Sequence, residues 1–340
     1  MTLTGDRAQP TLEEVAALAG VSRATVSRVV NGSPRVSAEA RSLVQRAVAQ
    51  LGYVPNRAAR SLVTRRTDSI ALVMSEPEDR VFSDPFFARI VRGVSAELAA
   101  TEVQLVLVMA RSPAQEERLE RYVAGGHVDG VLLASLHGDD PLPRKLEEAG
   151  VPVVLVGRPA AATRASYVDA DNRGGAAVAV QHLLARGRRR IATITGPLDM
   201  APGLDRLDGY RDALRAAGAR ATRRLVEEGD FTEESGQRAM RALLERAADM
   251  DAVFAANDLM AAGALDALRA AGRRVPEDVA VVGFDDSVVS RWSEPRLTSV
   301  AQPVEEMGRQ ITRLLLARIA GEAAGVSVIL HTNLVVRESS

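Results

Sequence analysis

The sequence predicts a small all-α headpiece with a helix-turn-helix, followed by an α/β core of two doubly wound parallel-sheet lobes. Two short amphipathic segments flank Gly20 near the N-terminus, as in a helix-turn-helix. Residues 1–67 carry ten arginines against four acidic residues, whereas the whole chain has a net charge of −1, so a basic head precedes an acidic body. From Ser69 onward, apolar segments of strand length alternate with helical patterns, which indicates parallel sheets. A chain of 340 residues is long enough for two or three domains.

The first two helices are indicated by a capping signal and an apolar seam. Thr11 and Glu14 have the spacing of a capping box, in which each side chain accepts a hydrogen bond from the other residue's backbone N–H. The next helix has an apolar edge made of Val21, Val26, Val29 and Val30. Its other edge carries Arg23, Ala24, Ser27 and Arg28. Such a helix fits the major groove of DNA, and the alternative is a solvated helix pair inside a larger core.

A third helix is predicted between Ser37, a suitable N-cap, and Gly52, which ends it. Three helices of this size can share a small core, so residues 1–53 are assigned to the headpiece. Residues 54–67 contain helix formers after a proline but no face that their own chain could bury. We therefore predict a linker there, which becomes helical only when something packs against it.

Two series of apolar segments predict the strands of the two lobes. The first series is Ile70–Met74, Val103–Met109, Gly130–Ala134 and Val153–Val156. The second series is Ile191–Thr195, Leu225–Glu228, Ala252–Ala255 and Val279–Gly283. The tail adds a segment at Arg296–Val300, an apolar helix at Val304–Ile319 and a final strand at Val326–Val336, and we expect it to cross between the lobes. The core is thus residues 68–340, with one lobe of about 68–169 plus 301–325 and another of about 170–300 plus 326–340.

Ligands of open α/β sheets bind beyond the carboxyl ends of the strands, so polar and aromatic residues just after strands are candidate contacts. In the first lobe these are Asp84, Phe86, Phe87, Ser135, His137 and Arg158. The crossover and the second lobe add Asp171, Asn172, Asp199, Arg206, Asn257, Asp258, Asp285 and Asp286. Asp171 and Asp258 have an alternative role as helix N-caps. Two facing lobes form a cleft that can close on a small molecule.

The composition excludes several classes of protein. The chain has no cysteine, and therefore no disulfide, thiolate metal site or cysteine nucleophile. It has no apolar run long enough to span a bilayer and no signal-peptide pattern in residues 1–10, so we predict a cytoplasmic, nucleoid-associated protein. The histidines lie at 127, 137, 182 and 331, without metal-ligand spacing, and the common nucleotide-binding and hydrolase motifs are missing. We predict no metal, no cofactor and no enzymatic activity.

These features occur in an order that resembles the lactose-repressor (LacI–GalR) family of bacterial transcription regulators. The most specific matching segments are Thr11–Ser22, Ala24–Gly32, Arg35–Ser37, Leu51–Asn56 and Ala59–Leu62. Shorter matches in the core are Asp84–Phe87, Val168–Asn172, Arg206–Tyr210, Ala255–Asp258, Val282–Asp286 and Leu297–Val300. The resemblance covers essentially the whole chain. It implies a DNA-binding headpiece, a hinge helix at 54–67 and a periplasmic-binding-protein-like core that dimerises and senses a small molecule.

By this resemblance, a defined set of residues contacts the operator. Arg23 and Ala24 are the positions that vary with operator sequence, through a bidentate guanine contact and an apolar contact respectively. Arg28 is a further base reader, or binds phosphate alone. Leu62 matches the wedge that enters the minor groove between two base pairs, and the alternative is an ordinary linker leucine. The other predicted contacts are Ser22, Thr25, Ser27, Asn31, Arg35, Tyr53, Asn56 and Arg60.

The resemblance also implies roles in the cleft. One of Phe86 and Phe87 is expected to touch the ligand, while the other packs in the core. Arg206 matches the family's ligand-clamping arginine, with Asn257 as a polar neighbour and Asp285 as a hydroxyl acceptor. Planar groups with several hydrogen-bonding atoms suit vicinal hydroxyls, each of which donates and accepts.

At two positions the sequence does not decide which ligand binds or which residues contact it. Several family members carry an acidic residue where Gly157 stands before Arg158, so no particular ligand can be transferred to this chain. Trp292, the only tryptophan, either lines the cleft or is buried in the core or at an interface.

The expected function is that of a repressor which binds a pseudopalindromic operator as a homodimer. A sugar or sugar derivative in the cleft is expected to release it, and a purine-type corepressor is the alternative. A sugar-binding transport protein fits less well, because it would need a signal peptide and no basic headpiece. An enzyme fits less well because the common catalytic motifs are missing. No heptad segment like the lactose repressor's tetramer-forming tail follows the core, which favours a dimer over a tetramer.

Overall fold

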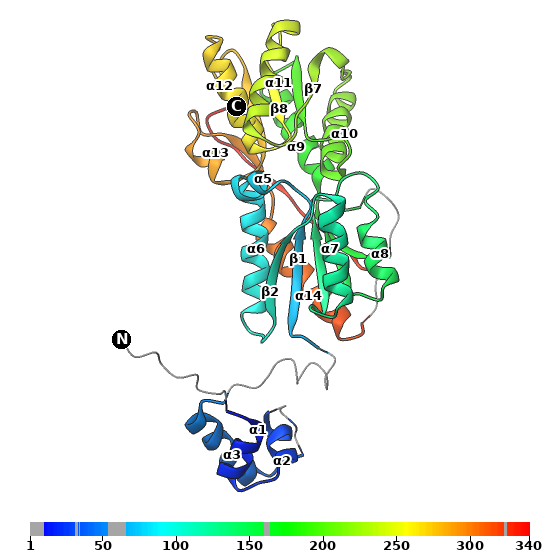
Figure 1. Cartoon of the computed structure of the whole chain (residues 1–340). Coiled ribbons are helices and arrows are strands. Elements are labelled where there is room, and N and C mark those ends of the chain that lie inside the picture. Colours follow the sequence, from blue (N-terminus) through cyan, green and yellow to red (C-terminus); the bar gives the residue numbers. More distant parts are fainter. Residues whose placement is uncertain (1–9, 31–32, 34, 54–65, 160–163, 323–324) are drawn as a thin grey trace, which may run out of the picture. The chain divides into compact units, whose positions relative to one another are not determined.

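The computed structural model describes residues 10–30, 33, 35–53, 66–159, 164–322 and 325–340. The chain divides after Thr67 into two compact units, which are drawn in Figure 1 and are treated separately below. Four predicted DNA contacts, Asn31, Asn56, Arg60 and Leu62, lie outside the described residues, as does most of the predicted hinge.

The first unit contains three helices: α1 (Leu12–Ala19), α2 (Arg23–Val30) and α3 (Ala38–Leu51). The capping box predicted for α1 is confirmed, and Gly20 ends this helix in a left-handed conformation with φ 65°. Val15, Val26 and Val44, one from each helix, are fully buried against one another in the shared core. This packing leaves the polar edge of α2 on the surface.

The first lobe of the core is a six-stranded parallel sheet. Its strand order is β11-β5-β4-β3-β1-β2. The strands are β1 (Ser69–Met74), β2 (Gln104–Met109), β3 (Gly130–Ala134), β4 (Val153–Val156), β5 (Ser166–Ala170) and β11 (Ser327–Leu330). The helices are α5 (Glu78–Ser83), α6 (Pro85–Leu98), α7 (Pro113–Ala124), α8 (Leu142–Glu148) and α14 (Val304–Ile319). Apolar clusters cover both faces of the sheet, which is why its central strands are almost uniformly apolar.

The second lobe has the same architecture, with strand order β12-β10-β9-β8-β6-β7. The strands are β6 (Ile191–Thr195), β7 (Val226–Glu228), β8 (Ala252–Ala255), β9 (Ala280–Asp285), β10 (Thr298–Ala301) and β12 (Asn333–Val335), of which β12 alone runs antiparallel to its neighbour. The helices are α9 (Asn172–Ala185), α10 (Ala201–Ala216), the 3-10 turn η1 (Arg223–Leu225), α11 (Glu233–Arg246), α12 (Asp258–Ala270) and α13 (Val288–Trp292). Figure 1 shows this lobe stacked end to end on the first.

The predicted architecture of the core is confirmed, with two corrections. Residues 166–170 form β5, a strand that the sequence did not indicate. The single strand predicted at Val326–Val336 is wrong, because the chain there forms β11 in the first sheet and β12 in the second. Residues 327–330 therefore belong to the first lobe rather than the second. The chain crosses between the lobes three times, before α9, before α14 and between β11 and β12.

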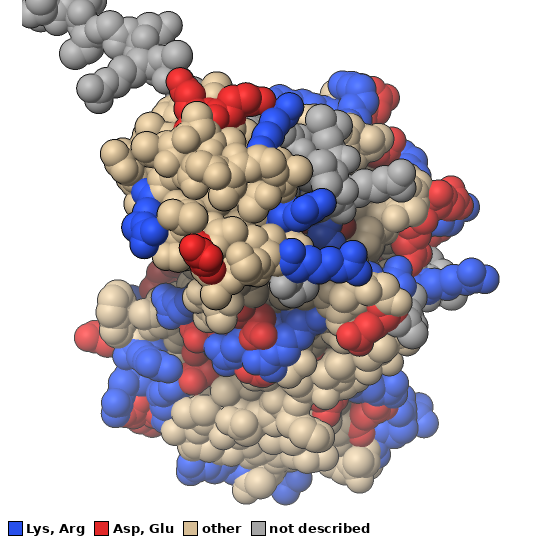
Figure 2. All heavy atoms as spheres, turned by 90° about the horizontal axis from the view of Figure 1, so that it is seen from below, with Lys and Arg blue, Asp and Glu red and all other residues tan. Residues whose placement is uncertain are grey.

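The face of the molecule seen in Figure 2 carries charges of both signs. On the face shown in Figure 2, basic and acidic side chains are interspersed with uncharged ones. Many exposed arginines of the core pair with acids, for example Arg274 with Asp278 at 2.8 Å and Arg173 with Asp212 at 2.6 Å. Among the described residues, no helix is long and apolar enough to cross a membrane.

Candidate nucleic-acid interface and interlobe pocket

The exposed edge of α2 carries the side chains predicted to read DNA. Arg23, Ala24 and Arg28 are exposed, while Val26 and Val29 on the opposite edge are buried. The side-chain oxygen of Ser22 accepts a hydrogen bond from the backbone N–H of Thr25 at 3.1 Å, which satisfies a donor at the helix start. Residue spacing and core packing thus leave one short basic helix edge open to a partner.

The arginines of the headpiece differ in their local partners. Arg23 pairs with Glu13 of α1 at 3.0 Å, with both side chains largely exposed. Among the described residues, no acidic side chain pairs with Arg28 or Arg35. Arg41 of α3, which the sequence did not single out, donates to the carbonyl oxygen of Ser33 at 2.8 Å and so ties α3 to the loop after α2. Arg28 and Arg35 keep their charges available to an anionic partner.

The other predicted DNA contacts in the described residues have mixed environments. Ser27 and Thr25 are half-buried on α2. Tyr53 is only 8% exposed and packs in the headpiece core. Its burial is explained by that packing, and its contact with DNA stays a prediction.

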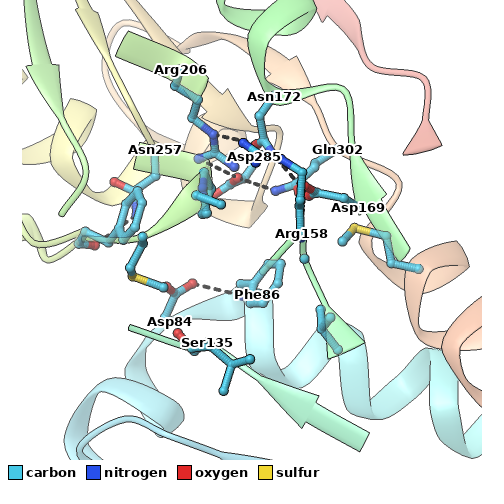
Figure 3. A pocket seen from close by; sticks show the side chains of 18 of the residues that line it. Asp84, Phe86, Ser135, Arg158, Asp169, Asn172, Arg206, Asn257, Asp285 and Gln302 are labelled. Atoms are coloured by element: carbon cyan, nitrogen blue, oxygen red, sulfur yellow. Dashed lines mark hydrogen bonds and ion pairs between the residues drawn. The ribbon is translucent and has the colours of Figure 1, made fainter. Parts of the chain in front are cut away.

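A pocket lies between the lobes of the core, beyond the carboxyl ends of their strands. Nine of the candidate contacts named from the sequence line it: Asp84, Phe86, Phe87, Ser135, Arg158, Asn172, Arg206, Asn257 and Asp285. Figure 3 shows these side chains and their neighbours converging from strands and helices of both lobes. The rule that ligands sit at the strand ends therefore located the pocket.

Arg206 is the centre of a buried polar array in this pocket. It lies on α10 and is 4% exposed. Its Nε donates to Asn172 Oδ1 at 2.9 Å, and its guanidinium also donates to the carbonyl oxygen of Ala256. Asp285 Oδ1 lies 3.7 Å from the guanidinium and accepts a hydrogen bond from Gln302 Nε2 at 2.8 Å. Figure 3 shows Asn172, Asp285 and Gln302 beside Arg206.

Burial controls the electrostatics of the array. Burial lowers the pKa of Arg206, which nevertheless stays charged because an arginine loses its proton only at very high pH. Burial raises the pKa of Asp285, and the neighbouring charge of Arg206 opposes that rise. Burial likewise raises the pKa of Asp84 and Asp169. Polar groups of a ligand can replace the water that these desolvated groups have lost.

Aromatic and sulfur-containing side chains form the apolar walls. Phe86 and Phe87, at the start of α6, lie edge to face with ring centroids 5.5 Å apart. Both line the pocket, but Phe87 is only 1% exposed and belongs to the core of the first lobe, whereas Phe86 is half-buried. The ring of Phe231 enters from the second lobe, with the guanidinium carbon of Arg80 5.2 Å from its centroid.

Two further candidates, Trp292 and His137, lie outside this pocket. Trp292 is 81% exposed on α13 and does not line the pocket, so its assignment to the pocket is wrong. His137 lies not in this pocket but in a second cavity farther along the cleft.

The two acids with alternative N-cap roles behave differently. Asp171 does cap α9, since its Oδ1 accepts from the backbone N–H of Gly174 at 2.8 Å. The cap of α12 is Asn257, not Asp258. Asp258 is 1% exposed. It accepts hydrogen bonds from the backbone N–H of Ser287 at 2.6 Å and from the hydroxyl of Ser299 at 2.5 Å. These bonds join α12 to β10 and to the loop after β9.

Several lining residues were missed by the sequence reasoning. Asp169 lies on β5, which the sequence did not indicate as a strand, and Gln302 lies on a lobe crossover. Arg80 and Phe231 follow strands, but their residue types alone give no signal. Among the described residues, no group of three or more His, Cys, Asp or Glu side chains could hold a metal ion.

Comparisons with known proteins agree with this architecture. Residues 11–56 match the family described as bacterial regulatory proteins, lacI family, and residues 180–340 match the periplasmic binding protein-like domain. The chain is 59% identical to the HTH-type transcriptional regulator CelR of Thermobifida fusca over 98% of this chain and 99% of that protein. It is 35% identical to the transcriptional repressor CytR of Escherichia coli over 97% of this chain and 96% of CytR.

Two solved structures extend the comparison. One is described as a transcriptional regulator CelR–cellobiose complex, with 57% identity, a TM-score of 0.79 and coverage of 98% of this chain and 100% of the other. The second is a lac repressor dimer bound to operator and an anti-inducer, with 29% identity, a TM-score of 0.85 and coverage of 98% and 99%. The chain therefore belongs to the lacI family of bacterial regulatory proteins.

Proposed function

We propose that this protein is a transcriptional repressor which binds a pseudopalindromic operator as a homodimer and is released by a neutral sugar bound in the interlobe pocket. Cellobiose, the β-linked glucose disaccharide named in the relative's structure, is the first candidate. The proposal assigns residues 1–53 to DNA binding, 54–67 to a hinge and 68–340 to ligand binding and dimerisation. The buried array around Arg206 is the single observation that carries it.

The chemistry of the pocket favours a neutral ligand rich in hydroxyl groups. Its lining contains three guanidinium groups and three carboxyl groups: Arg80, Arg158 and Arg206 with Asp84, Asp169 and Asp285. This balance provides no excess charge for a phosphate or another ion. Each sugar hydroxyl can donate to a carboxylate and accept from a guanidinium or amide, while the C–H face of a sugar ring packs on Phe86 or Phe231.

Two further observations support the DNA-binding and dimeric parts of the proposal. Arg28 and Arg35 are arginines without an acidic partner among the described residues, as a phosphate-binding surface requires. Phe82 and Trp292 are 76% and 81% exposed, which is unusual for such large apolar side chains and suits burial against a second copy of the chain. The relatives are regulators, and we infer that the pocket binds its ligand without converting it.

Ligand binding can control DNA binding only if the ligand has different affinities for the DNA-competent and DNA-incompetent arrangements of the dimer. We infer that a sugar which contacts both lobes favours one degree of cleft closure. The change in closure then alters the spacing of the two hinges across the dimer.

Isothermal titration calorimetry on the full chain tests the ligand. Cellobiose is compared with maltose, which differs in the linkage, with glucose, and with guanine as a probe of the purine alternative. The proposal expects heat from cellobiose and a markedly weaker response to maltose. Guanine binding with no response to either disaccharide would replace the sugar proposal with the purine-type corepressor.

A further inference from the structure

The cleft continues beyond the inner pocket into a second cavity, which is also lined by both lobes. Arg80 lines both spaces. His137, in the loop between β3 and α8, lines the second cavity from the first lobe. Asp199, in the loop between β6 and α10 of the second lobe, contacts His137.

The His137 ring is bound on both sides by carboxylates. Its Nε2 lies 3.0 Å from Oε1 of Glu76, which belongs to the first lobe and is 4% exposed. Its Nδ1 lies 2.9 Å from Oδ2 of Asp199 in the second lobe. The backbone N–H of Gly138 donates to the carbonyl oxygen of Asp199 at 2.8 Å, which fixes the same two loops against each other.

The geometry requires a particular protonation state. A neutral imidazole has one N–H, so it can donate to only one carboxylate and turns a lone pair toward the other. Only the imidazolium ion can donate to Glu76 and Asp199 together. The hydrogen bond with Glu76 raises the pKa of His137, burial opposes this rise, and the hydrogen bond with Asp199 adds to it.

We propose that His137 is a proton-dependent bridge between the lobes, so that closing the cleft is coupled to protonation of its ring. Opening the cleft moves Asp199 away from His137 and leaves Glu76 as the ring's carboxylate partner. Because the pKa of His137 is then higher in the closed state than in the open one, protonation stabilises closure fully below the open-state pKa, and this effect is lost as pH rises through the closed-state pKa. Closure should therefore be favoured near pH 6 and weakened near pH 8.

Other titratable groups face the same space. Glu76 accepts a hydrogen bond from the Ser135 hydroxyl at 2.6 Å and pairs with Arg80. Burial alone would raise the pKa of Glu76, but the hydrogen bond with His137 and the charge of Arg80 outweigh burial and lower this pKa. The remaining charged side chains around the cavity are Asp79, Arg111, Glu116, Asp139, Asp140, Asp230 and Glu234. Carboxylates as a class titrate near pH 4, so histidine is the side chain whose ordinary pKa lies between pH 6 and 8.

Buried acids in and beside the inner pocket require a control. Burial raises the pKa of Asp258 and Asp285, so either can add its own pH dependence to ligand binding. The difference between the wild type and a His137 variant isolates the bridge, because those acids are present in both proteins.

Nuclear magnetic resonance tests the bridge without any ligand. The chain has four histidines, so the ring Cε1–Hε1 signals of histidine-labelled full-length protein can be assigned by single substitution. We expect His137 to titrate above the ordinary histidine value and its pKa to fall in Asp199→Asn, which removes the charge but keeps the shape. The exposed His127, which stacks on Tyr122, is the matched control and should be unaffected. A His137 pKa at or below the ordinary value, or one unchanged by Asp199→Asn, overturns the proposal.

Cellobiose titrations at pH 6 and pH 8 test the consequence for closure, and this arm rests on the proposed function. We expect the Kd to be about two- to fivefold higher at pH 8, the range for an ion pair open to solvent, since Asp199 is 55% exposed. This ratio should shrink in His137→Gln and persist in His127→Gln. An equal ratio in the wild type and His137→Gln refutes the bridge. If cellobiose binds at neither pH while the resonance shifts appear as expected, the ligand assignment is wrong and the bridge is supported.

Discussion

At the scale of single residues, the pocket depends on a guanidinium group placed where water cannot solvate it. Arg206 is buried, and its partners Asn172, Ala256 and Asp285 come from three different segments. The guanidinium carbon also lies 3.8 Å from the ring centroid of Phe284. These contacts fix the planar group in one orientation before any ligand arrives, which reduces the entropy lost on binding.

Replacing Arg206 with lysine keeps the charge but removes the planar fork. We expect cellobiose affinity to fall by about tenfold or more, since hydrogen bonds to charged groups are worth about 1.5–3 kcal/mol. Calorimetry measures the change. Arg211→Lys, the same exchange at an exposed position of α10, is the control and should bind as the wild type does. Unchanged affinity in Arg206→Lys would remove Arg206 from the ligand site.

The DNA-reading proposal for Arg23 also belongs to this scale. Replacing Arg23 with alanine should relax the base preference at one position in each half-site and cost about 1–3 kcal/mol there. Binding selection from randomised duplexes measures the preference. Arg274→Ala, an exposed substitution in the second lobe, should leave it unchanged. A uniform loss across all sequences would indicate that Arg23 contacts only phosphate.

At the scale of elements, the first lobe depends on the close approach of two helices. A β-carbon at Gly93 of α6 would lie 2.1 Å from the carbonyl oxygen of Glu305 in α14 and 3.0 Å from the Cα of Gly308. Only glycine permits this contact. Because α14 follows a lobe crossover, its packing on α6 joins the tail of the chain to the first sheet.

Gly93→Ala should destabilise the core by about 1–3 kcal/mol, the usual cost of overpacking, although alanine favours a helix. Denaturant unfolding measures the effect. The control, Ser95→Ala, lies two residues away on the exposed side of α6 and gains helix propensity without a clash. Equal stability of Gly93→Ala and the wild type would show that α6 and α14 can separate at little cost.

The elements that sequence reasoning located are those with strong local signals. Thr11 and Glu14 marked the start of α1, and the apolar runs located β1, β3, β4 and β8 within a residue or so. β5 was missed because its sequence, Ser166–Ala170, mixes polar and apolar residues. The sequence also could not show that the final strand divides after Leu330 into β11 and β12. Both segments have the pattern of a strand, and only tertiary pairing assigns them to different sheets. Asp169 lies on the missed strand and Gln302 on a crossover between the lobes, so the strand-end rule singled out neither of them.

At the scale of the whole molecule, two functions are separated along one chain. Residues up to Thr67 form a unit with exposed arginines on α2, and residues from Asp68 form a two-lobed unit with a buried polar pocket. The two sites can influence each other only through a coupling free energy, which requires that the ligand bind two arrangements of the lobes with different affinities. Contacts across the cleft, such as Arg158 with Asp205 at 2.7 Å, are present only when the lobes are close and so can make that distinction.

The most direct test of the account is the affinity of the full-length protein for its operator with and without cellobiose. Fluorescence anisotropy at fixed pH and moderate salt, on a duplex obtained by selection from random sequence, gives both values. We expect sequence-specific binding whose Kd rises by about five- to 150-fold at saturating cellobiose. An operator Kd that does not change, in a sample that calorimetry shows to be saturated with the sugar, would contradict it.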